Sequence, residues 1–220
     1  TGTAEHRGLG SPADVRFAAM GHRRGRHVYQ ATDAVPASRL AEERPRYLRF
    51  MEEALGEPIG GRMHIDKNPS IVRLIPGMLR LFPECRLLIA IRDPRDVVVS
   101  CFFRYLPLNS VSVQYLTLER TARRYARGID AWLKLREIIP APWREVRYEA
   151  TVDDLAGEAR EALTFLGVEW DERVLDYRRR LEGRQVNSPT YEDVAKPVYR
   201  SAIGRWRNYE KHLPPAIELV

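Results

Sequence analysis

The alternation of apolar and polar residues is clearest between residues 86 and 100, RLLIAIRDPRDVVVS. An apolar run from 87 to 91 is followed directly by the charged stretch Arg-Asp-Pro-Arg-Asp. A run this short, bounded by charge and proline, is more typical of a strand buried on both faces than of a helix. Downstream, Asp93 suits a helix N-cap, Pro94 suits the first turn, and Asp96 would lie near the positive end of the helix dipole. We therefore predict a strand that leads directly into a helix.

An arginine stands where this strand meets the helix. In α/β proteins, anionic ligands bind where the carboxyl end of a strand meets the N-terminus of a helix. The pattern around Arg92 therefore predicts a phosphate site.

Helical spacing of apolar residues recurs in other parts of the chain. It predicts helices at about 46–55, 71–82 and 115–138, with a shorter helix at about 170–181. The segment 151–168, TVDDLAGEAREALTFLGV, predicts a further helix with Thr151 as N-cap and Gly167 at its end. Strands are expected at 143–149, WREVRYE, and at 63–65. Helices that alternate with short buried strands indicate a three-layer α/β fold.

Residues 1–45 show little apolar periodicity, and this favours a solvated or disordered segment in front of a folded domain of residues 46–220. The basic stretch 21–27, GHRRGRH, leaves a nucleic-acid-binding arm as the alternative. It lacks interleaved aromatic residues, so we expect no nucleic-acid partner.

Composition adds little to this picture. The net charge is +6, with 36 basic residues of which only four are lysine. The arginine fork suits phosphate and sulfate, but an arginine-rich genome explains the excess equally well. The two cysteines form neither a disulfide framework nor a metal motif, which fits a cytoplasmic protein. No apolar run reaches the roughly 18 residues of a membrane span, so no membrane partner is expected.

Four short motifs follow one another along the chain: DKNP (66–69), IRDPRDVVVS (91–100), VRYE (146–149) and KPVYRSAIGRW (196–206). Together they resemble sulfotransferases that use 3′-phosphoadenosine 5′-phosphosulfate (PAPS). They are most similar to the branch that contains bacterial tetratricopeptide-linked and protein-tyrosine sulfotransferases. The resemblance covers about residues 65–215 and implies a three-layer, P-loop NTPase-like parallel sheet flanked by helices. It also implies PAPS as donor, adenosine 3′,5′-bisphosphate as product, and no metal.

The resemblance assigns Arg92 and Ser100 to a clamp on the 3′-phosphate of the nucleotide. A guanidinium can bind two phosphate oxygens, while a hydroxyl farther along the helix donates a third contact. The alternative is that Arg92 pairs with Asp96 and that Ser100 is an ordinary helix residue.

Lys67 resembles the lysine that reaches the transferring sulfonate in the tyrosine-sulfating relatives. A positioned ammonium stabilises the charge that builds on the leaving phosphate in the transition state. The alternative is an exposed loop lysine paired with Asp66.

Three further positions match the family. Tyr148 resembles a tyrosine at a strand end that contacts the ribose or phosphate region, and Thr190 occupies a position where relatives often have a serine near the sulfate and phosphates. Arg205 resembles the basic residue that closes over the 3′-phosphate from the C-terminal loop. The predicted site is therefore catalytic Lys67 with nucleotide-binding Arg92, Ser100, Tyr148, Thr190 and Arg205.

One family feature is not visible upstream of Lys67: a Pro-Arg-Ser-Gly-Thr-Thr type of loop that cradles the 5′-phosphosulfate. We expect either that this loop lies before Thr1 or that the chain is a degenerate member. The expected function is sulfonate transfer to a hydroxyl of a peptide tyrosine, a carbohydrate or a small metabolite. The alternative is a pseudoenzyme that binds the nucleotide without transferring sulfonate. A P-loop kinase explains neither the missing Gly-Lys-Ser/Thr sequence nor the C-terminal motif.

Overall fold

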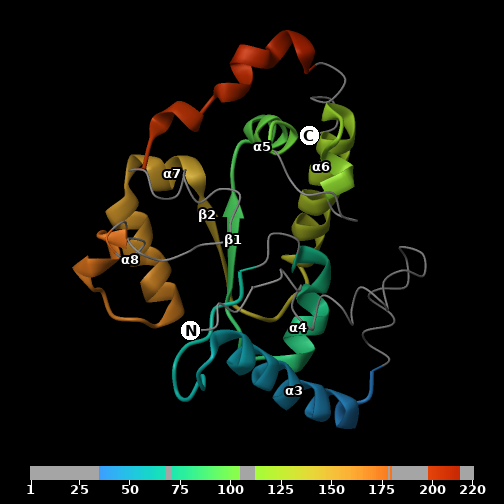
Figure 1. The fold of residues 1–220 in the computed structure, drawn as a ribbon, viewed down its shortest axis with the longest axis vertical. Helices are drawn as coiled ribbons and strands as arrows, with labels where there is room; N and C mark the ends of the chain where they lie inside the picture. Colours follow the sequence, from blue (N-terminus) through green and yellow to red (C-terminus); the bar gives the residue numbers. More distant parts are fainter. Residues whose placement is uncertain (1–34, 68–70, 105–111, 178, 180–197, 214–220) are drawn as a thin grey trace, which may run out of the picture. The chain divides into compact units, whose positions relative to one another are not determined.

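The computed structural model describes residues 35–67, 71–104, 112–177, 179 and 198–213 (Figure 1). The chain divides into two compact units, which we describe separately. The first unit comprises residues 1–85 and 134–141, and the second comprises residues 86–133 and 142–220.

The first unit contains helix α3 (Ala37–Leu55), a 3-10 turn η1 (Ile71–Leu74) and helix α4 (Ile75–Leu81). Helix α3 ends at Gly56, whose φ of 73° lies in the left-handed region, as the sequence predicted. Its predicted start was wrong, because the helix begins well before residue 46 and includes Pro45. The extra turns are mostly exposed and are built from good helix formers, so they carry no apolar stripe that a periodicity search detects. The proposed domain boundary at residue 45 stays a prediction, but residues 37–45 are helical.

The core of the first unit lies where α3 packs on α4. Tyr47 and Met78 are buried there, and Leu48, Met51, Leu74 and Phe82 pack against them. The expected strand at 63–65 is wrong, since residues 63–67 have no regular secondary structure. Met63 is 53% exposed and Ile65 is 72% exposed, so the two apolar side chains do not mark a buried strand face.

The second unit begins with strand β1 (Leu87–Ile91) and helix α5 (Pro94–Phe102). The 3-10 turn η2 (Ser112–Tyr115) and helix α6 (Leu118–Leu135, of which the last two residues belong to the first unit) lead to strand β2 (Trp143–Arg147). The two strands are parallel, and Leu87 pairs with Trp143 while Ile91 pairs with Arg147. Within the described residues the sheet has these two strands, so the chain is α/β and helix-rich with a small parallel sheet. The three-layer arrangement stays a prediction.

Two details of this sheet correct the sequence analysis. Positions in β1 alternate between part-buried and exposed, with Leu88 41% exposed, so the expectation of burial on both faces was wrong. Strand β2 ends at Arg147 and not at residue 149, because helix α7 (Tyr148–Asp153) begins immediately after it.

Helix α8 (Leu155–Leu166) follows α7 and ends at Gly167, as predicted. Its N-cap is Asp154, whose side chain accepts a hydrogen bond from the backbone N of Gly157 at 2.8 Å. The expected cap Thr151 lies inside α7, where its hydroxyl donates to the Arg147 carbonyl. Within the expected helix at 170–181, the described residues contain the short 3-10 turn η3 (Glu172–Val174), and residues 177 and 179 are helical.

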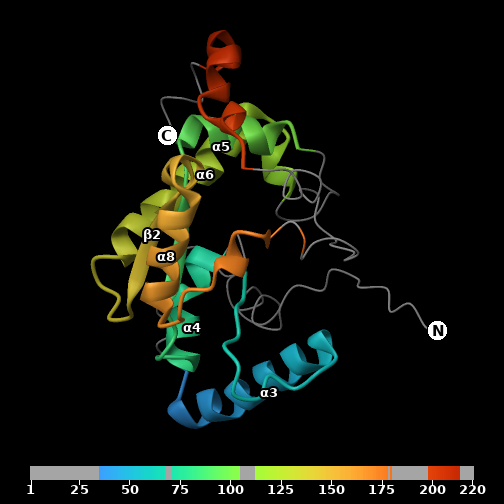
Figure 2. The same cartoon turned by 90° about the vertical axis from the view of Figure 1, so that its left-hand side faces the viewer.

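The C-terminal part of the unit consists of two 3-10 segments, η4 (Arg200–Ala202) and η5 (Arg205–His212). Helix α5 is packed on two sides. Val98 packs against Ala122 of α6, while Val99 packs against Trp206 and Leu213 of the C-terminal segment. Figure 2 shows η5, in red, beside α5. The α5 helix therefore joins the sheet to the chain's C-terminal segment.

No helix of the described ranges is both long and apolar enough to cross a bilayer.

Candidate functional site

The junction between β1 and α5 is built as the sequence predicts. Asp93 caps α5, its carboxylate accepting a hydrogen bond from the Arg95 backbone N at 2.8 Å, and Pro94 occupies the first turn. The Arg95 guanidinium returns to the same carboxylate, with Nε 3.0 Å from Oδ1 and Nη2 2.6 Å from Oδ2. The hydrogen bond from the Arg95 side chain lowers the pKa of Asp93. Asp93 is therefore an ionised cap that fixes the start of the helix.

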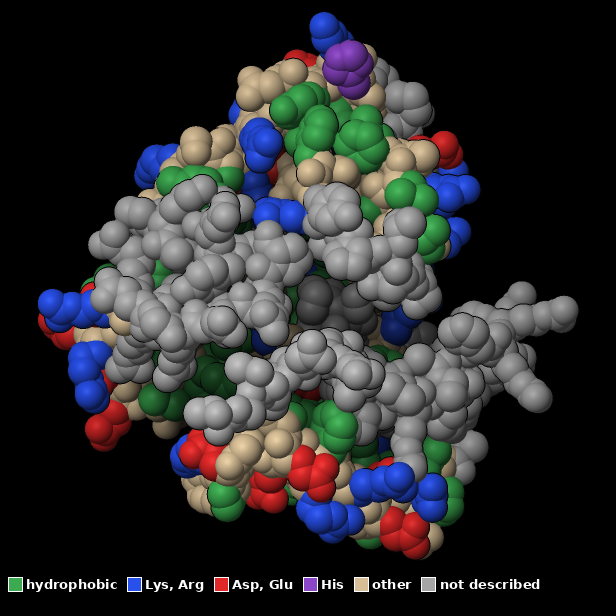
Figure 3. Space-filling view, in the orientation of Figure 1, with side chains coloured by type: hydrophobic (Ala, Val, Ile, Leu, Met, Phe, Trp, Pro, Cys, Tyr) green, Lys and Arg blue, Asp and Glu red, His purple; other side chains and the backbone are tan. Residues whose placement is uncertain are grey.

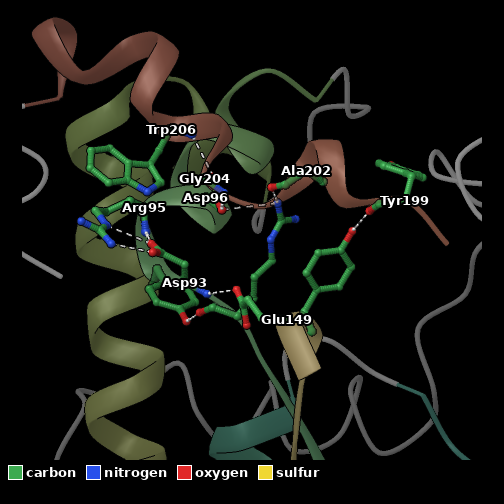
Figure 4. Close-up of polar contacts among 11 residues, drawn as sticks. Asp93, Arg95, Asp96, Glu149, Tyr199, Ala202, Gly204 and Trp206 are labelled. Carbon is green, nitrogen blue, oxygen red and sulfur yellow. Dashed lines mark hydrogen bonds and ion pairs between the residues drawn. The ribbon is translucent and has the colours of Figure 1, made fainter. Parts of the chain in front are cut away.

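Glu149 connects this junction to the end of the neighbouring strand. It lies in the first turn of α7, just beyond β2, and its Oε1 accepts a hydrogen bond from the Asp93 backbone N at 2.9 Å (Figure 4). Because β1 and β2 are parallel, their carboxyl ends lie at the same edge of the sheet. The Glu149 side chain ties the two ends together.

Arg92 lies at the centre of this edge. Its guanidinium carbon is 4.5 Å from the centroid of the Tyr148 ring, and its Nη2 donates a hydrogen bond to the Ala202 carbonyl. Its backbone carbonyl accepts a hydrogen bond from the Tyr125 hydroxyl at 3.2 Å. The side chain is only 20% exposed, and its Nε is buried with no hydrogen-bond partner among the described residues. One donor of Arg92, its Nε, is thus not used by the described residues.

The alternative pairing of Arg92 with Asp96 is present only as a long contact. The Arg92 Nη2 lies 3.9 Å from Asp96 Oδ2, which is too far for a hydrogen bond. Both Asp96 oxygens accept shorter bonds from backbone amides, at 2.7 Å from Gly204 and 2.9 Å from Trp206. Asp96 therefore serves the C-terminal segment more than it serves Arg92.

Two tyrosines support Arg92 from either side. Burial raises the pKa of Tyr148, whose hydroxyl donates to the Tyr199 carbonyl at 3.4 Å. Burial, with the nearby Asp93 and Glu149 carboxylates, raises the pKa of Tyr125 to about 12. Both hydroxyls consequently stay protonated at neutral pH and act as donors.

The structure brings together only some of the predicted site residues. Arg92 and Tyr148 are in contact. Ser100 is part-buried in α5, about 9 Å along the helix axis from Pro94 at 1.5 Å per residue. Arg205 is exposed at the start of η5, next to the anchored Trp206.

Of the remaining two predicted residues, one belongs to the first unit and the other is not described. Lys67 belongs to the first unit and is exposed, and the neighbouring Asp66 accepts a hydrogen bond from the Tyr47 hydroxyl at 2.8 Å. Thr190 lies outside the described residues, as does Lys196 at the start of the fourth motif.

The sequence analysis missed the roles of three residues around Arg92. Asp96 accepts hydrogen bonds from the Gly204 and Trp206 amides, Glu149 accepts one from the Asp93 amide, and Tyr125 donates one to the Arg92 carbonyl. Gly204, with a φ of 69°, offered a partial signal, because a glycine before Arg-Trp predicts a left-handed turn that needs an anchor. The sequence contains no comparable signal for Glu149 or Tyr125.

The junction carries charges of both signs. Arg92 and Arg95 face the carboxylates of Asp93, Asp96 and Glu149, and each carboxylate already accepts a hydrogen bond from backbone or side-chain N–H groups. The Nε of Arg92 has no hydrogen-bond partner among the described residues, which makes it a candidate donor to an anion oxygen. The residues fit an anion, but strong binding needs additional cations beside Arg92, and Arg205 of the C-terminal segment is a candidate.

A comparison with protein-family models gives a match to the sulfotransferase family over residues 10–172. The chain belongs to the sulfotransferase family. The first three motifs lie inside the match, whereas the C-terminal motif at 196–206 lies beyond it. The match also begins far upstream of residue 65, where we expected the resemblance to start, so the N-terminal part of the chain shares in it.

Among curated proteins, the chain is similar to a protein of Aquifex aeolicus (strain VF5) described as an uncharacterized protein. The two are 26% identical over 160 residues, which cover 71% of this chain and 20% of the relative. The chain therefore spans about a fifth of the length of this relative.

Proposed function

We propose that this sulfotransferase-family chain uses PAPS as donor and transfers its sulfonate to a hydroxyl acceptor. When bound, the nucleotide would supply the sulfonate group. The family match supports sulfonate transfer in general. The choice of nucleotide comes from the resemblance of the four motifs to PAPS-dependent sulfotransferases, and the β1–α5 junction supports it.

The observation that carries the proposal is the buried, unpartnered Nε of Arg92 at the carboxyl end of β1. A buried donor without a partner costs about 1 to 3 kcal/mol, so such groups in native proteins usually bind a ligand, an ion or an ordered water. The guanidinium is also held by the Tyr148 ring and the Ala202 carbonyl, so little side-chain entropy is lost on binding. Arg92 is thus preorganised to bind one anion, which we assign to the 3′-phosphate.

Other residues complete the proposed site. Ser100 and Arg205 would donate to the same phosphate, and Tyr148 would hold the Arg92 plane and border the ribose. Lys67 would stabilise the negative charge that grows on the leaving phosphate during transfer. Thr190 would bind near the sulfate end of the nucleotide.

The acceptor class is narrowed only to a hydroxyl compound: a peptide tyrosine, a carbohydrate or a small metabolite. Each of these carries a nucleophilic oxygen, and the described residues do not assign the base that takes its proton. An acceptor panel is therefore part of the test.

The experiment follows the transfer of sulfur label from PAPS in the full-length protein, with a tyrosyl peptide, an oligosaccharide and a small phenol as acceptors. We expect labelled product with at least one acceptor. Arg92→Ala should raise the KM for PAPS about 10- to 100-fold, because a charge-assisted hydrogen bond is lost. Arg123→Ala removes an exposed arginine of α6 that pairs with Glu119, and it serves as the matched control.

Two results would contradict the proposal. No labelled product from any acceptor, together with tight binding of adenosine 3′,5′-bisphosphate, would favour the pseudoenzyme alternative. Neither transfer nor binding would remove PAPS from the account altogether.

A further inference from the structure

The backbone of residues 199–206, which we name the C-terminal strap, lies against the β1–α5 junction at several points. Tyr148 donates to the carbonyl of Tyr199, Arg92 donates to the carbonyl of Ala202, and Asp96 accepts from the amides of Gly204 and Trp206. Figure 4 shows these contacts side by side. The strap thus supplies the Ala202 carbonyl, which occupies Nη2 of Arg92, while Nε of the same guanidinium has no partner among the described residues.

The hydrogen bonds that Asp96 accepts from the strap are the strongest of these contacts. The Asp96 side chain is fully buried, and both of its oxygens are used on the strap. Hydrogen bonds to a charged group contribute about twice as much as neutral ones. By comparison, Tyr148 makes a long bond of 3.4 Å, and Arg200 pairs with Asp153 on the exposed surface. Exposed pairs of that kind contribute little.

Apolar packing holds the last residue of the strap, Trp206, and the chain beyond it, but not residues 199–205. Trp206 and Leu213 are buried against Val99, whereas the ring of Tyr209 meets Phe103, which is 52% exposed. Figure 3 shows hydrophobic side chains gathered at the surface over η5 and α5. Residues 199–205 include none of these buried apolar side chains, so their position depends on polar anchors.

Gly204 explains why two amides of one short turn, those of Gly204 and Trp206, can point at one carboxylate. Its φ of 69° turns the backbone into the left-handed region just before η5 begins. This turn directs the amides of Gly204 and Trp206 toward Asp96. An added Cβ would lie 2.1 Å from Nη1 of Arg207 and would also strain the backbone.

We infer that Asp96 is a positioning residue for nucleotide recognition. It holds the strap so that the Ala202 carbonyl occupies Nη2 of Arg92 and leaves Nε for the ligand. This inference rests on the proposed function for its ligand, but the anchoring itself is independent of any ligand. Asp96 would act through the strap and Arg92, without touching the nucleotide.

The test combines amide hydrogen exchange with calorimetry on wild type and Asp96→Asn. Asparagine has nearly the same shape but keeps a single acceptor oxygen and no charge. We expect the Gly204 and Trp206 amides to exchange about 10- to 100-fold faster in the variant, since charge-assisted bonds are lost. The Kd for adenosine 3′,5′-bisphosphate should rise about tenfold, with the Kd for adenosine 5′-monophosphate unchanged.

Val98→Ala is the matched control, because Val98 is a buried neighbour on the same helix that packs on Ala122 instead of the strap. It should lower the melting temperature without selectively releasing the two strap amides. Gly204→Ala disturbs the same hydrogen bonds by changing the strap, so the test can still be made if Asp96→Asn does not fold. It should reproduce the faster exchange of the strap amides.

The outcomes separate the two hypotheses. Unchanged exchange at Gly204 and Trp206 in both strap variants would overturn the inference, as would faster exchange with unchanged bisphosphate affinity. If wild type binds no bisphosphate, the proposed function fails, and selective loss of amide protection in Asp96→Asn would still support Asp96 as the anchor of the strap.

Discussion

The β1–α5 junction of the second unit and the Lys67 segment of the first unit are organised in different ways. At the junction, Arg92 is held by a tyrosine ring and a backbone carbonyl, and the helix start is capped. Lys67, by contrast, is exposed on a segment without regular secondary structure. The predicted nucleotide-binding residue is therefore preorganised within the chain, whereas the predicted catalytic residue is not.

This difference has a physical meaning for function. A preorganised donor gives binding energy in both the ground state and the transition state, so its loss weakens nucleotide affinity. A cation that contacts charge only as the reaction proceeds affects the rate more than the affinity. The comparison predicts that variants at the two places differ in the kinetic constant they change.

The largest effect is expected for Lys67→Ala in the full-length protein. The kcat for sulfonate transfer should fall by about 10² or more, with only a few-fold change in nucleotide affinity, because one charge donor to the leaving group is removed. Lys211→Ala removes an exposed lysine of η5 and is the matched control. Steady-state kinetics with labelled PAPS measures both constants. An unchanged kcat would exclude Lys67 from the mechanism.

A smaller effect is expected at the helix cap of the junction. Asp93→Ala should lower the free energy of unfolding by about 1 kcal/mol, since the N-cap acceptor is lost. Asp93→Asn keeps an acceptor oxygen and should lose less. Denaturant unfolding of both variants measures the difference, and equal losses would argue that the cap hydrogen bond is not the stabilising contact.

The same residue gives a pH dependence. The folded-state pKa of Asp93 is lowered by Arg95, so its ionised form stabilises the fold above the unfolded pKa, about 4 for an aspartate. This stabilisation is lost as the pH falls from about 4 through the folded-state pKa. The stability difference between wild type and Asp93→Asn should therefore shrink on acidification. A difference that stays constant from pH 7 down to about pH 2 would contradict the assignment.

A stability effect of similar size is expected beside Lys67. Tyr47→Phe removes the hydroxyl that donates to Asp66 and should cost about 1 kcal/mol of stability, the usual net value of one hydrogen bond. It should lower kcat far less than Lys67→Ala does. Thermal unfolding and kinetics on one preparation test this, with Tyr209→Phe as control. A kcat loss as large as that of Lys67→Ala would show that the segment near Lys67 is held more rigidly than we describe.

The sequence predicted the local parts of this architecture well. The run 87–91, Pro94 and Asp93 define the strand, the helix start and its cap through contacts between near neighbours. The start of α3 was missed because its first turns are exposed and show no apolar stripe. The strand expected at 63–65 failed because three apolar or aromatic residues do not reveal whether a partner strand exists.

The long-range part of the site was beyond sequence reasoning. Asp96 and Trp206 are 110 positions apart in the chain, and their contact depends on how α5 packs against η5. The pattern RDPRD identified Asp96 as a helix-dipole residue and as an alternative partner of Arg92, but not as an anchor of the C-terminal segment. For Arg92 the sequence predicted the position, but the Tyr148 ring and the Ala202 carbonyl that hold the side chain came from the structure.

The central claim is that Arg92 recognises a 3′-phosphate, and calorimetry with paired nucleotides tests it most directly. Adenosine 3′,5′-bisphosphate and adenosine 5′-monophosphate are titrated into wild type, Arg92→Ala and the control Arg123→Ala. We predict that wild type and the control prefer the bisphosphate, and that Arg92→Ala loses about 1.5 to 3 kcal/mol of its binding, about one to two decades in Kd. Equal affinity of wild type for both nucleotides, or an undiminished preference in Arg92→Ala, would contradict the account.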